Sequence, residues 1–540
     1  MNATLAALVG APPLLLLLLG AVPDRWANCH PRQMGRLTVV ATLIAAAMLL
    51  LAALGVAARG AVTRQVGMGS DLLRLDLWFD ALAAIMGLLI SCLGVVVARY
   101  SVRYLDGDPA QGRFLRWIGF TLGAVLSLVV AGNLGIFIMA WVLTSLGLHQ
   151  LLTHYADRPA ALLAARKKFL ISRLGDLMLV VALALIYWSC GSLAYQELFT
   201  WAAAEHSSAT GPSWTVELAC ICLVLGAMTK SAQFPFHSWL PDTMETPTPV
   251  SALMHAGVIN AGGFLVLRLS PLLCLSHVAL DLLVVIGATT ALFGALVMLT
   301  QVSIKRALAY STVAQMGFML LQCGTGAFAA ALLHIVGHSL YKAHAFLNSG
   351  SAVQSKQAQD GREYAQAGVL SSWGALGAAV MLALPLCWLW TAWLGADLPK
   401  KPGGYLLGAI LTLAVVQLLW HALMTPNPRI WLRGIASAVA VCSAYALGYR
   451  LIDAALADSI ARELPRPSAL DVAAWLLVLT GFAAMFGLQA GVEQAQRNPA
   501  LRALWVHAVN GFYVDIFARR MVTRVWRRPS EGAPLAAPHV

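Results

Sequence analysis

The sequence predicts an all-α polytopic membrane protein with about 14 to 16 transmembrane helices. The chain has 540 residues, of which 59% are hydrophobic and only 11% are charged. Soluble domains carry about 25% charged residues, so this composition indicates an integral membrane protein. Apolar runs of about 20 residues, the length that spans a bilayer, recur along nearly the whole chain. These runs leave no room for a sizeable soluble domain.

The apolar runs divide the chain into five parts. We expect N-terminal transmembrane helices over residues 1–110, a first repeat over 111–270, a second repeat over 271–425, C-terminal helices over 426–510, and a basic, partly disordered tail over 511–540. Each repeat is predicted to hold five helices, one of them broken by a proline, Pro235 in the first and Pro385 in the second. Broken helices at corresponding positions are typical of inverted repeats with an ion site between them. Two unrelated prolines are the alternative.

The charge balance indicates the kind of partner. The net charge is +12. In a membrane protein such an excess is typical of cytoplasmic loops and of contact with anionic lipids. Basic and aromatic residues are not interleaved as on a nucleic-acid surface, so we expect the lipid membrane and no nucleic acid among the partners.

The sequence also lacks the common catalytic signatures. It contains no nucleotide-binding loop, no GxSxG or CxxC motif, and no haem or flavin motif, and its nine cysteines are scattered. This pattern predicts a transporter subunit rather than an enzyme, with no cofactor and no metal.

The stretch from Met228 to Phe264 carries the strongest functional signal. It places Lys230 in an apolar run, with Pro235 five residues later and His255 in a second apolar run. A charged amine in hydrocarbon is costly unless it is paired, hydrated or deprotonated. A proline there frees backbone carbonyls that only a cavity or a neighbouring helix can satisfy. Together these features predict an ion path, and snorkelling of Lys230 to the membrane interface is the alternative.

Lysines are rare in this chain, with eight against 28 arginines. A desolvated lysine can release its proton whereas arginine effectively cannot, so Lys230 and Lys342 suit proton storage and release. His334, His338 and Lys342 are spaced i, i+4, i+8 and line one helix face, drifting about 40° per step. Such a stripe can relay protons. We favour a relay over a metal site because no HExxH pattern and no nearby carboxylate accompany the histidines.

Two further titratable residues lie in apolar surroundings. His255 could exchange a proton between Lys230 and Lys342, because histidine titrates near physiological pH; a structural core histidine is the alternative. Asp176 is the best-placed membrane carboxylate, and moving a carboxylate toward or away from a lysine supplies a switch. The alternative is an ion pair with Arg173, three residues earlier on the same face. The sequence leaves these alternatives open.

Four segments carry a family resemblance. They are TKSAQFPFHSWLPDTMETPTPVSALMHA, SIKRALAYSTVAQMGFM, HSLYKAHAFLNSGS and the C-terminal NGFYVDIFARR. They resemble motifs of antiporter-like proton-pumping subunits, which include the large distal membrane subunit of respiratory complex I, its photosynthetic relatives and the Mrp sodium/proton antiporter subunits. The resemblance covers residues 75–350 firmly and implies a bundle of inverted five-helix repeats. It also implies a family carboxylate position at Asp176 and a proton path through Lys230, His255, Lys305, His334, His338 and Lys342.

The chain departs from this family in two places. The family usually has a glutamate that partners the broken-helix lysine, but here Trp141 is followed by Val142. Asp176 or His149 would have to take its part. The second broken helix normally carries a lysine after its proline, and none occurs here before Lys400.

Further features narrow the resemblance. The segment HAGVINAGGF, the shorter chain and the missing glutamate resemble the membrane subunit of two-component inorganic-carbon transporters. That resemblance implies a multi-pass protein of the bacterial inner membrane whose proton or sodium flow drives carbon dioxide to bicarbonate conversion. It implies a large peripheral zinc-binding, carbonic-anhydrase-like subunit as partner. A proton-pumping subunit of a complex I-like oxidoreductase and an Mrp-type antiporter subunit are the alternatives.

Overall fold

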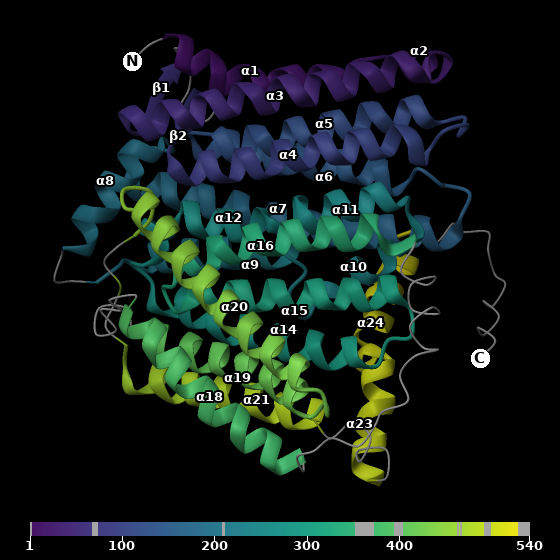
Figure 1. Cartoon of the computed structure of the whole chain (residues 1–540). Helices are drawn as coiled ribbons and strands as arrows, with labels where there is room; N and C mark the ends of the chain where they lie inside the picture. Colours follow the sequence, from purple (N-terminus) through teal and green to yellow (C-terminus); the bar gives the residue numbers. More distant parts are fainter. Residues whose placement is uncertain are drawn as a thin grey trace.

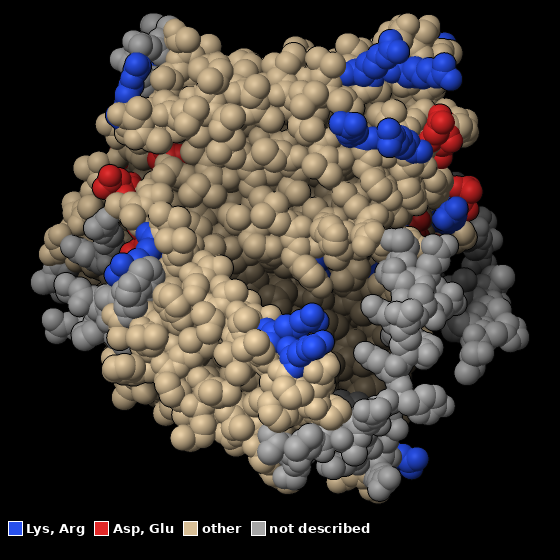
Figure 2. Space-filling view, in the orientation of Figure 1, with Lys and Arg blue, Asp and Glu red and all other residues tan. Residues whose placement is uncertain are grey.

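The computed structural model describes residues 3–66, 74–207, 211–350, 372–393, 403–461, 464, 467–490 and 498–526. Most helices run side by side in successive layers, from α1 and α3 at one edge to α18, α19 and α21 at the other (Figure 1). On the face shown in Figure 2, most charged side chains gather toward the two ends of these helices, with a broad and largely uncharged band between them. This distribution matches a bundle whose helices cross a bilayer.

The N-terminal part forms one edge of the bundle. Its elements are α1 (Ala3–Leu19), α2 (Asp24–Cys29), α3 (Pro31–Arg59), β1 (Val62–Val66), β2 (Leu75–Phe79) and α4 (Ala81–Tyr104). β1 and β2 form an antiparallel hairpin in which Val62 pairs with Phe79. Asp80 then caps α4, because its carboxylate accepts the Ala83 amide at 2.9 Å.

The next part supplies five membrane helices, and we call it the first set. Its long elements are α5 (Gln111–Val130), α6 (Leu134–Leu152), α7 (Pro159–Cys190), α9 (Trp214–Lys230) and the pair α11 (Thr248–Ala256) and α12 (Ala261–Arg268). Its short elements are α8 (Tyr195–His206), η1 (Phe236–Ser238), α10 (Trp239–Asp242), η2 (Thr243–Glu245), η3 (Val258–Asn260) and α13 (Ser270–Leu273). The segment from Thr248 to Arg268 is wholly buried and forms the centre of the molecule.

The second set again holds five membrane helices. They are α14 (His277–Leu299), α15 (Ile304–Gly324), α16 (Phe328–Leu347), α18 (Ser372–Trp393) and α19 (Gly403–Leu423). The C-terminal part contains α20 (Pro428–Ala455), α21 (Ala469–Ala490), α23 (Pro499–Val509), η4 (Gly511–Tyr513) and α24 (Val514–Val525). α20 crosses the layered helices obliquely, and α24 lies across their ends (Figure 1).

The helix count agrees with the sequence prediction. Eleven helical segments in the described ranges are long and apolar enough to cross a membrane. Helices α1, α9, α15 and α16, with 17 to 21 residues each, run alongside them and bring the total to fifteen.

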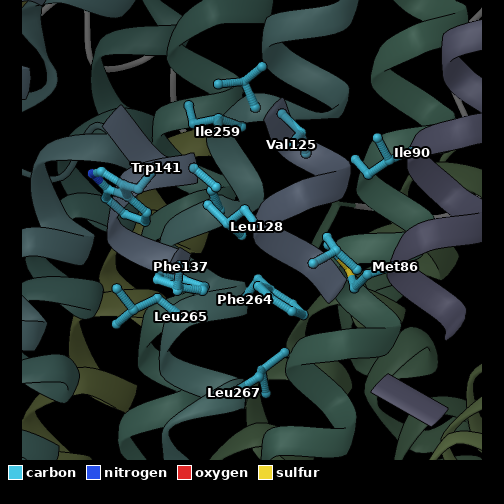
Figure 3. Packing of buried hydrophobic residues seen from close by; sticks show 14 of the residues in the cluster. Met86, Ile90, Val125, Leu128, Phe137, Trp141, Ile259, Phe264, Leu265 and Leu267 are labelled. Carbon is cyan, nitrogen blue, oxygen red and sulfur yellow. The ribbon is translucent and has the colours of Figure 1, made fainter. Parts of the chain in front are cut away.

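Large apolar side chains join the N-terminal part to the first set. Met86 of α4, Leu128 of α5, Phe137 of α6 and Phe264 of α12 converge in one packed core (Figure 3). The rings of Phe137 and Phe264 stack with centroids 6.3 Å apart. This packing gives a rigid frame for the polar groups described next.

A buried ion pair fastens one end of this core. Arg268 is 1% exposed and its two terminal nitrogens contact the Asp80 carboxylate at 2.6 and 2.9 Å. The Trp78 indole donates to the same carboxylate at 3.1 Å. Burial opposes ionisation of Asp80, but the Arg268 charge and these hydrogen bonds outweigh it and lower the pKa of Asp80. The pair therefore locks the start of α4 to the end of α12.

A cluster of charges fastens α24 to the rest of the molecule. Lys167 of α7 is buried and donates to Asp242 at 2.5 Å and also to Asp515 of α24. Arg519, one turn along α24, pairs with Asp515. The tail arginines Arg527 and Arg528 lie outside the described residues, as does Lys400.

Candidate ion path

Lys230 is the last residue of α9, and the chain then leaves the helix before η1. Ala232 adopts φ of 48°, which is uncommon for a residue with a side chain. The Ser231 hydroxyl donates to the Ile259 carbonyl at 2.7 Å, and the Phe234 amide donates to the Thr290 hydroxyl at 3.0 Å. Thr290 of a neighbouring helix thus satisfies a backbone amide at this interruption, and Ser231 satisfies a backbone carbonyl of the turn between α11 and α12.

Lys230 is buried and has neutral partners. Its side chain is 6% exposed, so it does not snorkel to an interface. Its Nζ donates to the Trp141 carbonyl at 3.0 Å and lies 4.5 Å from the centre of the Trp141 ring. The next residue on α6 is Val142, at the position where the resemblance leads one to expect a glutamate. A backbone carbonyl and a π-face therefore replace a direct carboxylate partner.

Asp176 of α7 takes up both of the alternatives that the sequence left open. Its carboxylate pairs with Arg173 at 2.6 Å, as the i, i+3 spacing suggested. It also interacts electrostatically with Lys230 and with Lys168. Asp176 is therefore the carboxylate that acts on Lys230, although it also forms an ion pair with Arg173 on its own helix.

Lys168 of α7 is a buried lysine that was not among the residues predicted from the sequence. It is 2% exposed, and its Nζ contacts the Ser145 carbonyl at 2.5 Å and the Ser145 hydroxyl at 2.7 Å. Its spacing from Asp176 could have revealed it, because residues eight apart share a helix face. Ser145 lies one turn of α6 beyond Trp141, so α6 holds Lys168 and Lys230 at successive turns.

His255 lies at the end of α11, just before a second interruption. α11 stops at Ala256, and a 3₁₀ turn separates it from α12. His255 is fully buried, its Nδ1 is 3.0 Å from the Thr312 hydroxyl, and its ring stacks on Phe346 at 4.4 Å. The sequence contains no proline at this break, and only Gly257 marked it.

The stripe on α16 forms as its spacing predicted. The His334 and His338 rings lie 6.0 Å apart, and His334 Nδ1 is 3.0 Å from the Gln322 side-chain oxygen. Lys342 is buried, and its Nζ donates to the Leu308 carbonyl of α15 at 2.9 Å. His338 interacts electrostatically with both Lys342 and His255. His255 therefore joins the α16 stripe as one group.

A cleft gives this stripe access to the outside of the bundle. Its volume is about 570 Å³, and it lies between α15, α16 and α20. The lining includes His334, His338, Gln322 and Tyr445.

A line of uncharged polar groups lies between Lys230 and the α16 stripe. Ser231 contacts the Ile259 carbonyl, and the adjacent Asn260 donates its side-chain amide to the Ser339 hydroxyl of α16 at 2.8 Å. Asn260 and Ser339 are fully buried. The sequence analysis did not single out either residue, although Asn260 is a polar residue within the apolar HAGVINAGGF segment.

Lys305 lies at the edge of this arrangement. It is half-buried at the start of α15, and its Nζ donates to the Thr248 hydroxyl at 3.3 Å, at the first residue of α11. This places it toward the membrane surface relative to His255.

The expected break at Pro385 is absent. α18 continues through Pro385 from Ser372 to Trp393. Its neighbours in the chain, Leu384 and Leu386, offer no polar group to satisfy freed backbone atoms, so retaining the helix costs less than breaking it. The second interruption lies between α11 and α12 instead.

Within the described residues no group of three or more His, Cys, Asp or Glu side chains could hold a metal ion. The buried groups of the candidate path are lysines, histidines and a carboxylate, all of which are titratable. The fold and this row of titratable groups define an antiporter-like, ion-translocating membrane subunit.

Comparisons with known proteins agree with this class. The family described as "NADH:quinone oxidoreductase/Mrp antiporter, TM" matches residues 131–428, and the complex I chain 5 N-terminus matches residues 68–115. The chain belongs to this NADH:quinone oxidoreductase/Mrp antiporter family and is an ion-translocating, multi-pass membrane subunit.

Two bacterial relatives match over most of their length. The "Probable inorganic carbon transporter subunit DabB2" of Halothiobacillus neapolitanus is 38% identical over 98% of this chain and 96% of its own. The "Probable inorganic carbon transporter subunit DabB" of Hydrogenovibrio crunogenus is 33% identical over 81% of each chain.

Two further matches cover less of the relative. The chloroplastic "NAD(P)H-quinone oxidoreductase subunit 5" of Dioscorea elephantipes is 41% identical, but over only 52% of this chain and 37% of its own. Among solved structures, the Mrp complex from Dietzia sp. has a TM-score of 0.62 at 25% identity, and the match covers 98% of this chain and 64% of that one.

Proposed function

We propose that this chain lets protons flow down their gradient and thereby energises inorganic-carbon uptake by a peripheral partner subunit. The length of the match carries this proposal. The Halothiobacillus carbon transporter subunit aligns over 96% of its length, whereas the chloroplastic subunit aligns over 37%. We further propose that the partner is a large zinc-binding, carbonic-anhydrase-like subunit that converts carbon dioxide to bicarbonate. Sodium ions are the alternative to protons.

For the path itself, we propose Lys230 as the central proton carrier. Its partners are a carbonyl and an aromatic ring, both of which tolerate a neutral amine as well as an ammonium. Asp176, shared with Arg173, adjusts the balance between the two forms. The uncharged polar groups Asn260 and Ser339 support transfer toward His255 and the α16 stripe.

The stripe then forms the outer half of the proposed path. His255, His338 and Lys342 interact electrostatically, and His334 opens on the cleft beside α20. Lys305 is proposed to connect this group to the membrane surface through Thr248.

We place the path in the bacterial inner membrane with its basic end in the cytoplasm. Successive helices reverse direction, so the end of α4, the start of α5 and the start of α7 share one end of the bundle. That end carries Arg99, Arg103, Arg113, Arg158 and Arg166. Positive residues gather on cytoplasmic loops, which supports this orientation.

The carbon-uptake proposal is tested by growth. A host that lacks carbonic anhydrase should grow at ambient carbon dioxide when the chain and its proposed partner are co-expressed, and not when either is expressed alone. The Lys230→Ala variant is the control, because it should assemble with the partner and fail to rescue. Absence of rescue by a well-expressed, assembled wild-type complex would count against the proposal.

An Mrp-type role is the second candidate, because the Dietzia Mrp structure aligns with 98% of this chain. It predicts that expression protects a sodium-sensitive host against sodium chloride. Protection without growth rescue at ambient carbon dioxide would favour that role over carbon uptake.

A further inference from the structure

Lys167 and Lys168 are adjacent buried lysines with opposite surroundings. Lys167 contacts two carboxylates, Asp242 and Asp515. Among the described residues, the Lys168 amine hydrogen-bonds to the carbonyl and the hydroxyl of Ser145. A buried ammonium without a carboxylate partner is costly, whereas a neutral amine can use the same two contacts. We therefore expect that Lys168 can release its proton.

The position of Lys168 links it to Lys230. Lys230 is held at Trp141 and Lys168 at Ser145, which are one turn apart on α6, or about 6 Å along the axis. Val142, where the family places a glutamate, lies between these two attachment points. The Ser145 hydroxyl can donate and accept hydrogen bonds, so it can bridge a proton transfer along this face.

His149 continues the same face of α6 by one further turn. Its Nδ1 is buried without a hydrogen-bond partner, and its ring packs on Phe169 at 5.5 Å. α6 ends three residues later, at Leu152, on the basic end of the bundle. Ser145, Lys168 and His149 therefore lead from Lys230 toward that end.

The charges around Lys168 limit how many protons the site holds. The groups that act on it are Lys230 of α9, Arg173 and Asp176 of its own helix, and His149 of α6. Asp176 is shared with Arg173 through their ion pair. Two lysine ammonium groups and one arginine would then depend on this one carboxylate within the described residues, and the repulsion between the two ammonium groups favours a single proton on the pair.

We propose that Lys168 is a second proton carrier, which exchanges one proton with Lys230 through Ser145 and connects Lys230 to the basic end through His149. In the transfer, the Lys168 ammonium gives one proton to the Lys230 amine and becomes neutral, so the total charge of the pair stays constant. After Lys230 has passed that proton toward His255, His149 returns a proton to Lys168, and the pair again holds one proton. This inference rests on the proposed proton flow through Lys230.

The test uses the full chain reconstituted with its co-expressed partner in lipid vesicles that contain a pH-sensitive dye. Arginine cannot release its proton at physiological pH, but it keeps the charge and the donors toward Ser145. Lys168→Arg should therefore lower proton flux roughly 10²-fold, as expected for loss of a positioned proton-transfer group. Lys167→Arg is the matched control and should keep flux within about twofold, because arginine can maintain both carboxylate pairs.

The outcomes separate the two proposals. Wild-type flux with equal flux in Lys168→Arg would refute the role of Lys168 while leaving the proposed function intact. No proton flux in the assembled wild-type complex would refute the proposed function itself. Lys168→Met removes charge and donors together. If it fails to assemble while Lys168→Arg assembles and conducts normally, Lys168 is a structural cation, and the inference is wrong.

Discussion

The first and second sets each contain a proline flanked by large apolar residues, yet only one of them is interrupted at that point. At Pro235 the helix has already ended at Lys230 and the chain turns through η1. At Pro385 helix α18 continues. The segment Thr248–Arg268, which follows the first break, is 100% buried. In the apolar part of α18 that contains Pro385, only 22% of the residues are buried.

The surroundings of the two prolines explain the difference. Beside Pro235, Thr290 of α14 accepts the Phe234 amide and Ser231 reaches the Ile259 carbonyl. Such hydrogen bonds satisfy backbone polar groups at an interruption, which would otherwise be costly inside a membrane. α18 lies at the edge of the bundle, and Pro385 is exposed there (Figure 1). A proline therefore marks a possible break, and the neighbouring helices decide whether it occurs.

We expect the buried ion pair between Arg268 and Asp80 to contribute much of the stability of the first set. Arg268→Met leaves the Asp80 carboxylate buried without its cation, which should cost about 3–5 kcal/mol. The melting temperature of the purified protein measures this. The double variant Asp80→Leu/Arg268→Met should recover most of the loss, since it removes both charges. Equal loss in single and double variants would show that packing, not charge, holds this end.

The pairing has a defined pH dependence. The pKa of Asp80 is lowered in the folded state. The ion pair therefore stabilises the fold fully above the ordinary aspartate pKa of about 3.9, and this stabilisation is lost as the pH falls through the lowered pKa of Asp80.

The comparison predicts that ion flow depends on Lys230. Lys230→Ala should lower proton flux by about 10²-fold or more, because it removes the titratable amine at the break. Flux into dye-loaded vesicles measures this, with co-purification of the partner as the assembly control. Normal proton flux in an assembled Lys230→Ala variant would show that the ion path does not pass through Lys230 of α9.

Asp176 should have a smaller effect, because it is shared between Arg173 and the lysines. Asp176→Asn leaves the Arg173 cation near Lys230, and loss of about 1.4 kcal/mol of favourable interaction would lower flux roughly tenfold. The double variant Asp176→Asn/Arg173→Gln should restore part of the flux. If the single variant conducts normally, Asp176 serves only its ion pair with Arg173.

Pro385 should have the smallest effect on flux. Pro385→Ala should leave proton flux within about twofold and raise the melting temperature, since proline inside a helix is about 3 kcal/mol less favourable than alanine. Vesicle flux and thermal unfolding test both expectations. A strong loss of flux would give α18 a role in the path that its continuous helix does not suggest.

The predictable part of the site follows from local spacing. The stripe of His334, His338 and Lys342 needed only the helical repeat, and Arg173 with Asp176 needed only an i, i+3 spacing. The break between α11 and α12 was harder to predict, because Gly257 is the one residue in the sequence that indicates it. Lys168 and Ser145 lie on different helices, so no local pattern could join them.

The sequence by itself determined that this chain is a many-helix membrane bundle, because apolar runs of bilayer length admit few other structures. It also determined that Lys230 stands at an interruption. Tertiary structure alone decided what each buried charge meets. It gave Lys230 the Trp141 carbonyl, Lys167 two carboxylates and Lys168 a serine. In a bundle the partner of a buried charge comes from a neighbouring helix, and the packing of helices sets that choice.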